Sequence, residues 1–283
     1  MKRILLCQLV LLLTGLLAAA QFPEDWQNSR SWSGGGRRGG TPSRDSFPTW
    51  EIPSGFRHDV FTFTRIEFDS LGPFGWHDRW DNDYPDGDWN FSMRLHQLTS
   101  LEVDPNGLVL RLTDPRLFDS PFVYFAGVQY MTLDQSEQSA FRQYLQRGGF
   151  FMMDDLWGLD SRENVERIMR QVLPDAQPVE LALEHEIFHT VFDLQALPQV
   201  TDYLTWSRGG TFEATHEGAM GDTAPHFLAY YDKTRRMVGL VCHNNDIGDG
   251  WEREGEHEEY FQQYALKHSY PFGINVITYA MTH

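Results

Sequence analysis

Short apolar segments alternate with amphipathic segments through the middle of the chain. Residues 122–126 and 150–153 have the composition of buried strands, and residues 132–147 between them carry apolar side chains at helical spacing. A second helical segment, 161–172, follows and ends before Pro174. Parallel strands need a long crossover connection, which is usually a helix. The alternation therefore predicts an α/β fold, a three-layer sandwich around a mostly parallel sheet.

The flanking segments extend this pattern into a single domain over residues 58–283. We expect a helix at 88–99 with Asp88 as its N-cap, because Phe91, Leu95 and Leu98 fall on one face. Residues 198–225 are predicted to be a long insertion rich in Gly and Thr. The remaining predicted elements are strands at 60–68, 108–112, 179–183, 187–192, 227–231 and 237–242 and helices at 257–268 and 271–282.

The first twenty residues have the order of a secretory signal peptide. Lys2 and Arg3 precede an apolar run over residues 4–17, and Ala18 to Ala20 supply the small residues that signal peptidase needs. A membrane anchor is the alternative, but the apolar run is at the short end for a spanning helix and a polar, turn-rich chain follows it. We predict cleavage near Ala20 and a periplasmic or secreted protein without a membrane span in the mature chain.

Residues 21–57 have the composition of a flexible linker. Gly, Ser, Arg and Pro dominate this stretch, which cannot bury enough apolar surface to offset the loss of backbone entropy on folding. A plain spacer is the favoured interpretation. The alternative is a segment that docks on the acidic body through its arginines, Trp32 and Trp50.

The net charge of the chain is −17, from 23 basic and 40 acidic residues. A surface of this sign repels nucleic acid and anionic lipid, which argues against both as partners. It suits a protein that binds cations, a small polar ligand or another protein. Cys7 leaves with the signal peptide, so Cys242 alone cannot form an internal disulfide, and stability must come from the core.

Two acidic clusters are expected at the carboxyl ends of strands, where open α/β sheets bind their ligands. Asp154 and Asp155 directly follow the predicted strand at 150–153. The second cluster follows the strand at 237–242, and its hard oxygen donors alternate with glycines, as in Ca²⁺ or Mg²⁺ loops. It does not have the spacing of an EF-hand, and a hydrogen-bonded loop without an ion is the alternative. The candidate binding residues are Asp154, Asp155, His243, Asn244, Asn245, Asp246, Asp249, Glu252 and Arg253.

Histidine and cysteine offer weaker candidates. His185 and His189 match the letters of the zinc motif H-E-x-x-H, but that motif needs a helix, and the flanking residues favour extended chain. His216, Glu217 and His226 could join a site in space. Cys242 beside His243 is a possible activated thiol, although no nucleophile-elbow pattern surrounds it and a buried core cysteine is the favoured interpretation.

At these residues the sequence resembles a bacterial family called domain of unknown function 4159, over about residues 58–283. The matching stretches are Asp83-Tyr84-Pro85, Asn90-Phe91, Arg94-Leu95, Gln97-Leu98, Leu112-Thr113-Asp114-Pro115, Gly148-Gly149-Phe150, Asp154-Asp155, Gly158, Pro178-Val179-Glu180, Ile187-Phe188-His189, Cys242-His243-Asn244, Asp246, Gly248-Asp249-Gly250-Trp251-Glu252-Arg253, Tyr270-Pro271, Gly273 and Asn275.

The resemblance implies a fold similar to class I glutamine amidotransferase-like proteins, which are flavodoxin-like. Those amidotransferases use a Cys–His–Glu triad with the cysteine on a strand-to-helix elbow. Here the strand ending at Met153 leads to Asp154 and Asp155 instead, so the resemblance does not extend to glutaminase activity.

Two functions remain open from the sequence. The first is an exported binding module that takes a polar ligand, a partner or a divalent cation at the Asp155–His243–Asp246 rim. The second is a hydrolase in which a metal or a carboxylate–His pair activates water. In that case Asp155 would be a base or ligand, His243 a ligand or acid, and Asp246 or Asp249 a ligand.

Overall fold

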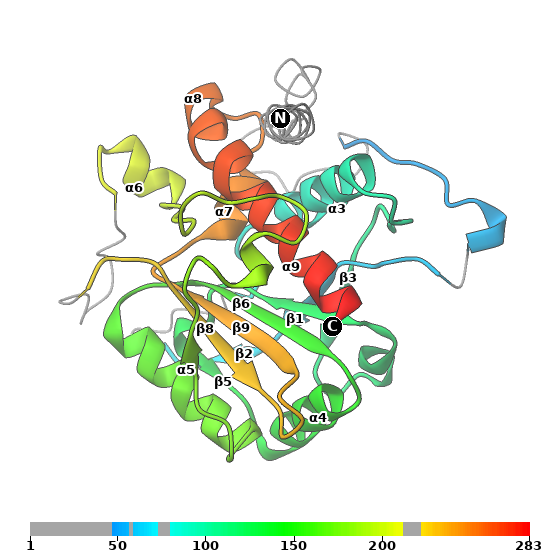
Figure 1. Cartoon of the computed structure of the whole chain (residues 1–283), viewed down its shortest axis with the longest axis vertical. Coiled ribbons are helices and arrows are strands. Elements are labelled where there is room, and N and C mark those ends of the chain that lie inside the picture. Colours follow the sequence, from blue (N-terminus) through cyan, green and yellow to red (C-terminus); the bar gives the residue numbers. More distant parts are fainter. Residues whose placement is uncertain (1–46, 57–58, 73–79, 212–221) are drawn as a thin grey trace, which may run out of the picture. The chain divides into compact units, whose positions relative to one another are not determined.

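A mostly parallel sheet forms the centre of the computed structural model, which describes residues 47–56, 59–72, 80–211 and 222–283. Its seven strands have the order β3-β1-β4-β6-β9-β8-β7 (Figure 1). The first five are parallel to one another, β8 is antiparallel to β9, and β7 is antiparallel to β8. The strands are β1 Thr64–Glu67, β3 Leu108–Arg111, β4 Phe122–Phe125, β6 Phe150–Leu156, β7 Val179–Glu180, β8 His226–Tyr231 and β9 Met237–His243. The predicted α/β class with a mostly parallel sheet is confirmed.

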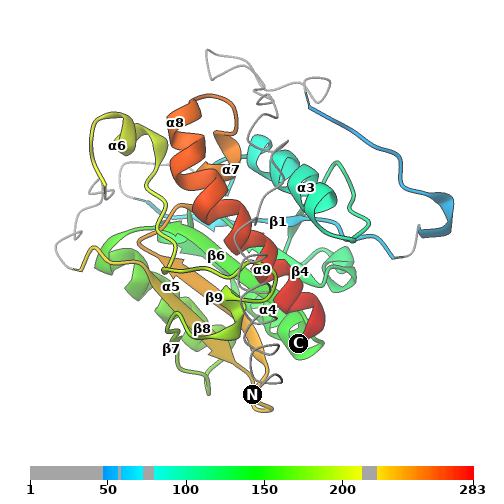
Figure 2. The same cartoon turned by 45° about the horizontal axis from the view of Figure 1, so that its top comes forward.

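Helices cover both faces of the sheet. Figures 1 and 2 show α4 (Gln135–Gln146) and α5 (Gly158–Val172) on one side, and α3 (Asp86–Leu98), α7 (Ile247–Glu252) and α9 (Tyr270–Thr282) on the other. Phe141 of α4 contacts Phe125 with ring centroids 5.4 Å apart, while Trp251 of α7 contacts Tyr124 on the opposite face at 5.5 Å. Alternate side chains of β4 therefore enter two separate cores, which is why the whole strand is apolar or aromatic.

The start of α4 follows its sequence closely. Asp134 is the N-cap: its carboxylate accepts the backbone N–H of Glu137, and the Glu137 side chain accepts the backbone N–H of Asp134. This reciprocal capping box satisfies two donors that a helix start would otherwise leave unpaired. The helix lies within the predicted segment 132–147.

Three predicted boundaries were wrong. β6 continues through Asp154 and Asp155 to Leu156 instead of ending at Met153, because a register shift in its pairing with β9 lets the strand carry polar residues at its end. Asp88 is not the N-cap of α3. The helix begins earlier, at Asp86, so Asp88 lies within its first turn. Both oxygens of the Asp88 carboxylate accept the Arg65 Nε–H, each at 3.0 Å.

The third wrong boundary is the predicted strand at 187–192. A 3-10 helix, Glu186–Phe188, lies there, with His185 as its N-cap. The apolar side chains of Ile187 and Phe188 are buried, and burial rather than strand pairing explains the apolar run.

The remaining elements lie around this core. β2 (Asp69–Ser70) and β5 (Met131–Thr132) form a separate two-stranded antiparallel sheet. A short helix, α6 (Tyr203–Ser207), falls within the predicted insertion. At the end of the chain α8 (Glu258–Tyr260), a π-helix over Phe261–Ser269 and α9 follow one another without a break.

The predicted signal peptide and most of the predicted linker lie outside the described residues, as do His216 and Glu217. The described end of the linker contacts the domain: the Trp50 indole N–H donates to the Val103 carbonyl at 2.8 Å, and its ring stacks on His96.

Candidate cation site at the carboxyl ends of the strands

Carboxylates from three separate segments meet beyond the carboxyl ends of the parallel strands. The connection from β2 to α3 supplies Asp83, and the end of β6 supplies Asp154 and Asp155. The segment from the end of β9 through α7 supplies three more: Asp246, Asp249 and Glu252. The order of strands reverses beside β1, which has β3 on one side and β4 on the other, and open sheets bind ligands at such a switch point. All six side chains are buried, with at most 6% exposure: Asp83, Asp154, Asp155, Asp246, Asp249 and Glu252.

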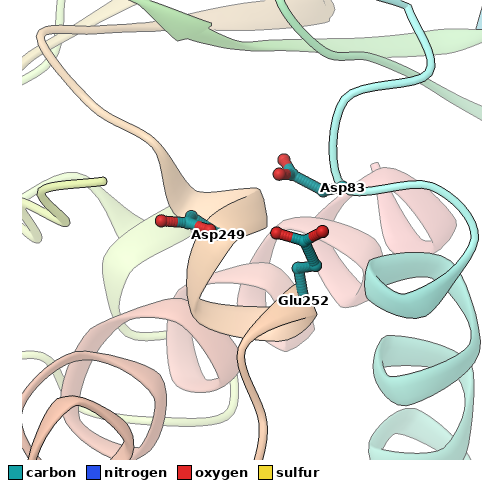
Figure 3. A group of neighbouring side chains, drawn as sticks. All are labelled: Asp83, Asp249 and Glu252. Carbon is teal, nitrogen blue, oxygen red and sulfur yellow. The ribbon is translucent and has the colours of Figure 1, made fainter. Parts of the chain in front are cut away.

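Three of these side chains form a group that could hold one ion. Figure 3 shows Asp83 on the loop before α3, facing Asp249 and Glu252 on α7. One carboxylate oxygen from each residue lies within 4.8 Å of the other two. Oxygens at this separation could contact a common cation, because Ca²⁺ and Mg²⁺ take oxygen ligands at about 2.0–2.6 Å.

Gly248 of α7 makes room for the Asp83 carboxylate in this group. A Cβ added to Gly248 would lie 2.6 Å from Asp83 Oδ2 and 2.5 Å from the Tyr124 hydroxyl, both shorter than any ordinary contact. On the facing helix α3, by contrast, a Cβ at Gly87 would make only ordinary contacts, 3.4 Å from the Asp83 Cβ and 3.7 Å from the Gly248 carbonyl oxygen. The absence of a side chain at residue 248 therefore leaves the space that the Asp83 carboxylate and the Tyr124 hydroxyl border.

One oxygen of the Asp83 carboxylate, the buried Oδ2, has no hydrogen-bond donor in the part of the chain that the structure describes. Burial raises the pKa of Asp83 well above its ordinary value, and the negative charges of Glu252, Asp249 and Asp155 raise it further. An ionised carboxylate in such a position is costly unless a proton or a cation compensates it.

Asp154 lies beneath the start of α7. Its Oδ2 accepts the Tyr124 hydroxyl at 3.0 Å and the Gly248 backbone N–H at 2.9 Å, whereas its Oδ1 has no partner among the described residues. Burial raises its pKa to about 7, partly offset by the Gly248 N–H. Asp154 therefore fixes the first turn of the helix that carries Asp249 and Glu252.

Asp246 is the N-cap of α7, where its Oδ1 accepts the Asp249 backbone N–H at 3.0 Å. Burial raises the pKa of Asp246 well above its ordinary value, and Asp155 and Asp83 are the next causes. The mutual effects of these carboxylates show that Asp246 belongs to the same electrostatic cluster as Asp83.

Backbone strain concentrates at this edge of the sheet. Four residues other than glycine have positive φ in the described part of the chain, and three of them are here: Asp83 at 62°, Asp155 at 53° and Asn244 at 55°. Such conformations cost of order 1–3 kcal/mol each and cluster at functional sites. Asp155 is held in place by the Asn82 side-chain amide, which donates to its Oδ2 at 2.7 Å.

One cation of the protein itself contacts the group. The guanidinium of Arg253 bonds Asp249 at 3.0 Å, Glu252 at 2.8 Å and Glu256 at 3.1 Å. A single positive charge is thus shared by three carboxylates, and burial still raises the pKa of Asp249 despite it. When the cluster is fully ionised, Arg253 therefore compensates only part of its negative charge.

The other residues of the predicted loop have separate positions. His243 is buried and its Nε2 bonds the Gly158 carbonyl at 2.8 Å, with the ring stacked on His226. Burial lowers the pKa of His243 to about 4. The amides of Asn244 and Asn245 bond backbone groups instead, including the Gly158 N–H and the Val200 N–H. These side chains hold the surrounding loops.

The weaker candidates lie elsewhere in the fold. His185 accepts the Ile187 backbone N–H, and both ring nitrogens of His189 are engaged, by Asp193 and by the Leu183 carbonyl. His226 contacts Glu180 and Asp222. Cys242 is fully buried in β9, and burial raises the pKa of its thiol well above the ordinary value, which is the environment of a core cysteine.

Asp83 was not among the site residues predicted from the sequence. It lies in a loop rich in Gly, Pro, Trp and Asp, where a single aspartate has no local pattern to distinguish it. The stretch Asp83-Tyr84-Pro85, which carries part of the family resemblance, was the one signal that pointed to it.

The family comparison agrees with the resemblance. The family described as domain of unknown function DUF4159 matches residues 62–281. The chain belongs to this family. No curated protein matches the chain. In the described part of the chain, no helix has the length and apolar character that a membrane crossing requires.

Proposed function

We propose that this domain is an exported binding module whose ligand is a hard divalent cation, Ca²⁺ or Mg²⁺, held by Asp83, Asp249 and Glu252. The observation that carries the proposal is the convergence of these three buried carboxylates, one of which has an unpartnered buried oxygen. A bound cation supplies the charge that the cluster lacks and satisfies Asp83 Oδ2.

The donor set favours a hard cation. Its members are all carboxylates, and oxygen donors suit Mg²⁺ and Ca²⁺, whereas Zn²⁺ and Cu²⁺ sites usually include imidazole or thiolate. The nearby His243 is directed to the Gly158 carbonyl rather than to the group. Waters and backbone carbonyls would complete the coordination.

Export fits this ligand. The predicted signal peptide at residues 1–20 would deliver the domain to a compartment where extracellular-type calcium modules bind with Kd values of about 10⁻⁴–10⁻³ M. The net charge of −17 also attracts cations to the surface. The flavodoxin-like, glutamine amidotransferase-like class belongs to the same proposal, because that class binds ligands at this edge of the sheet.

Isothermal titration of the metal-stripped mature chain, residues 21–283, with CaCl₂ and with MgCl₂ tests the proposal. We expect saturable binding of at least one of the two ions. Asp83→Asn is expected to weaken that binding by about 100-fold, because the substitution removes a charged ligand without changing shape. Glu258→Gln, on the exposed first turn of α8, is the matched control and should leave binding unchanged. Absence of saturable binding, or equal loss in both variants, rejects the proposal.

A hydrolase is the second candidate, and one observation favours it. Asp155 has a left-handed backbone at the point where β6 leads into α5, and strained strand-to-helix turns of this kind present catalytic groups in other α/β enzymes. In this version Asp83, Asp249 and Glu252 would hold a cation that would make a bound water more acidic, and Asp155 would be the base that takes the proton of that water. Turnover of an ester or phosphoester that disappears in Asp155→Asn, with cation binding retained, would select the hydrolase. No turnover across such a panel would leave the binding module.

A further inference from the structure

The segment Pro198–Gly210, here called the strap, crosses the site edge and contains α6. Its backbone is tied to the loop after β9: the Val200 N–H donates to the Asn245 side chain at 2.8 Å, and the Asp246 N–H donates to the Val200 carbonyl at 3.1 Å. The Asn245 amide also donates to the Pro198 carbonyl at 2.9 Å. The strap is therefore anchored to the turn that leads into α7.

The strap also contacts one of the three carboxylates directly. The backbone N–H of Tyr203 donates to Asp249 Oδ2. The Tyr260 hydroxyl lies at the same point, 3.3 Å from Asp249 Oδ2 and 2.8 Å from the carbonyl oxygen of Thr201, which is part of the strap. Tyr260 is fully buried, so this junction of strap, hydroxyl and carboxylate is shielded from water.

We propose that the strap is a positioning element of the cation site: the Tyr203 N–H and the Tyr260 hydroxyl hold Asp249 in the orientation of a ligand, and cation binding in turn fastens the strap. This inference rests on the proposed function. Each carboxylate oxygen has two lone pairs. The two strap-side donors bond Asp249 Oδ2, and Oδ1 accepts the Arg253 Nε–H, so Oδ1 keeps a lone pair for a cation. Partners that bond metal ligands in this way typically change metal affinity about 10–100-fold when removed.

The coupling has a physical cause in the charges around Asp249. Without a cation, Asp83 and Asp202 of the strap repel Asp249, and Arg253 and the Tyr203 N–H oppose that repulsion. A cation removes the repulsion and keeps Asp249 where the strap can bond it. Because coupling between two binding events is reciprocal, anything that releases the strap must also weaken the cation.

Limited proteolysis measures the strap directly. Arg208 is exposed and directly follows α6, so trypsin can cut after it when the strap detaches. Lys233 and Arg235, in the exposed turn between β8 and β9, provide an internal control in the same molecule. We expect the cation that binds in the titration to slow cutting after Arg208 at least fivefold, and to leave cutting at the turn unchanged.

One substitution removes the strap donor alone. Tyr203 is the first residue of α6, where proline is well tolerated, and Asp202 before it has the extended backbone (φ −55°, ψ 146°) that precedes proline. Tyr203→Pro therefore deletes the N–H that bonds Asp249 and preserves the start of the helix. Tyr203→Leu is the matched control: it removes the ring, which lies 5.5 Å from the Arg253 guanidinium, and keeps the N–H.

We expect Tyr203→Pro to raise the Kd of the cation about tenfold and to abolish the protection of Arg208, whereas Tyr203→Leu changes the Kd less than threefold. Tyr260→Phe should fall between them. If the wild type binds the cation but Arg208 is cut at the same rate with and without it, or if Tyr203→Pro binds as tightly as the wild type, the strap inference is wrong and the proposed function survives. If the wild type binds neither Ca²⁺ nor Mg²⁺, both are wrong.

Discussion

Two sets of buried charged side chains lie around α3 and α7, and they differ in how completely their charges are compensated. In the first set, Arg65 of β1 donates to Asp88 through Nε and, at 2.5 Å, through Nη2. Its Nη1 donates to the backbone carbonyls of Trp80 and Asn82. Arg94 likewise bonds Glu254. In the second set, Asp83, Asp249 and Glu252 lie together, and within the described residues the guanidinium of Arg253 is the cation that bonds two of them.

The difference separates structure from function. A buried ion pair with complete hydrogen bonds needs nothing from solution, whereas removing one partner is strongly destabilising. A buried group of like charges raises the pKa of its members and calls for a proton or a cation. The paired set joins α3 to β1 and to the segment after α7, and the carboxylate-rich set forms the proposed cation site.

Arg65→Met should give the largest effect, because it leaves Asp88 buried without its partner. We expect a loss of about 3–5 kcal/mol in the free energy of unfolding, measured by urea denaturation. Arg111→Met, on neighbouring β3, breaks partly exposed ion pairs with Glu67 and Asp69 and a longer one with Glu137, and is expected to cost less than about 1 kcal/mol for each exposed pair. Similar losses for the two variants would remove the contrast between a buried pair and a surface pair.

Gly248→Ala tests the close approach of α3 and α7. Its Cβ would collide with Asp83 Oδ2 and with the Tyr124 hydroxyl, so we expect a loss of about 1–3 kcal/mol and weaker cation binding in calorimetry. Gly55→Ala is the control, because a Cβ there would meet nothing within 4 Å. Unchanged cation binding in Gly248→Ala would show that Asp83 is not held against α7.

Asp154, in the carboxylate-rich set, makes the stability of the fold depend on pH with a known sign. Its pKa is raised from 3.8 to about 7 on folding, so between about pH 4 and 7 the folded protein keeps a proton that the unfolded chain has lost. Its contribution to stability therefore falls as pH rises through this window, by up to about 1.4 kcal/mol per pH unit.

His243 changes the pH dependence of stability in the opposite direction. Its contribution cancels when the stabilities of two variants that both keep His243 are subtracted. Its pKa is lowered from 6.5 to about 4, so it raises stability as pH increases between those values. We expect the unfolding free energy of wild type minus that of Asp154→Asn to decrease from pH 4 to pH 7. A flat difference would mean that Asp154 is not the group with the raised pKa.

Asp83→Asn should give the smallest change in stability. The sign of that change distinguishes the two sets most clearly. In chelator the variant is expected to be more stable than the wild type by on the order of 1 kcal/mol, because it removes repulsion within the cluster. In saturating cation the order should reverse, since the wild type alone gains the binding energy. Thermal unfolding of wild type and variant, with chelator and with saturating cation, measures the stability difference in each condition. A loss of stability of the variant in chelator would place Asp83 in the paired set.

Much of the fold was readable from the sequence because its signals are local. The apolar segment 122–126 and the capping residues around Asp134 act through neighbours in the chain, and β4 and α4 lie where they were predicted. The strand-end rule for parallel sheets likewise placed Asp154, Asp155 and the loop after β9 at one edge. Asp88 was misread because its partner, Arg65, is distant in sequence and tertiary contact outweighs the preference for the N-cap position.

The sequence by itself determined an acidic α/β chain with carboxylates at the ends of two strands, because composition and periodicity are properties of the chain alone. Only the tertiary structure decided which carboxylates share a site. Asp83 joins Asp249 and Glu252 because Gly248 leaves room for its carboxylate against α7, and His243 is excluded because it bonds Gly158. Such proximity depends on the packing of distant segments, and no pattern of neighbouring residues encodes it.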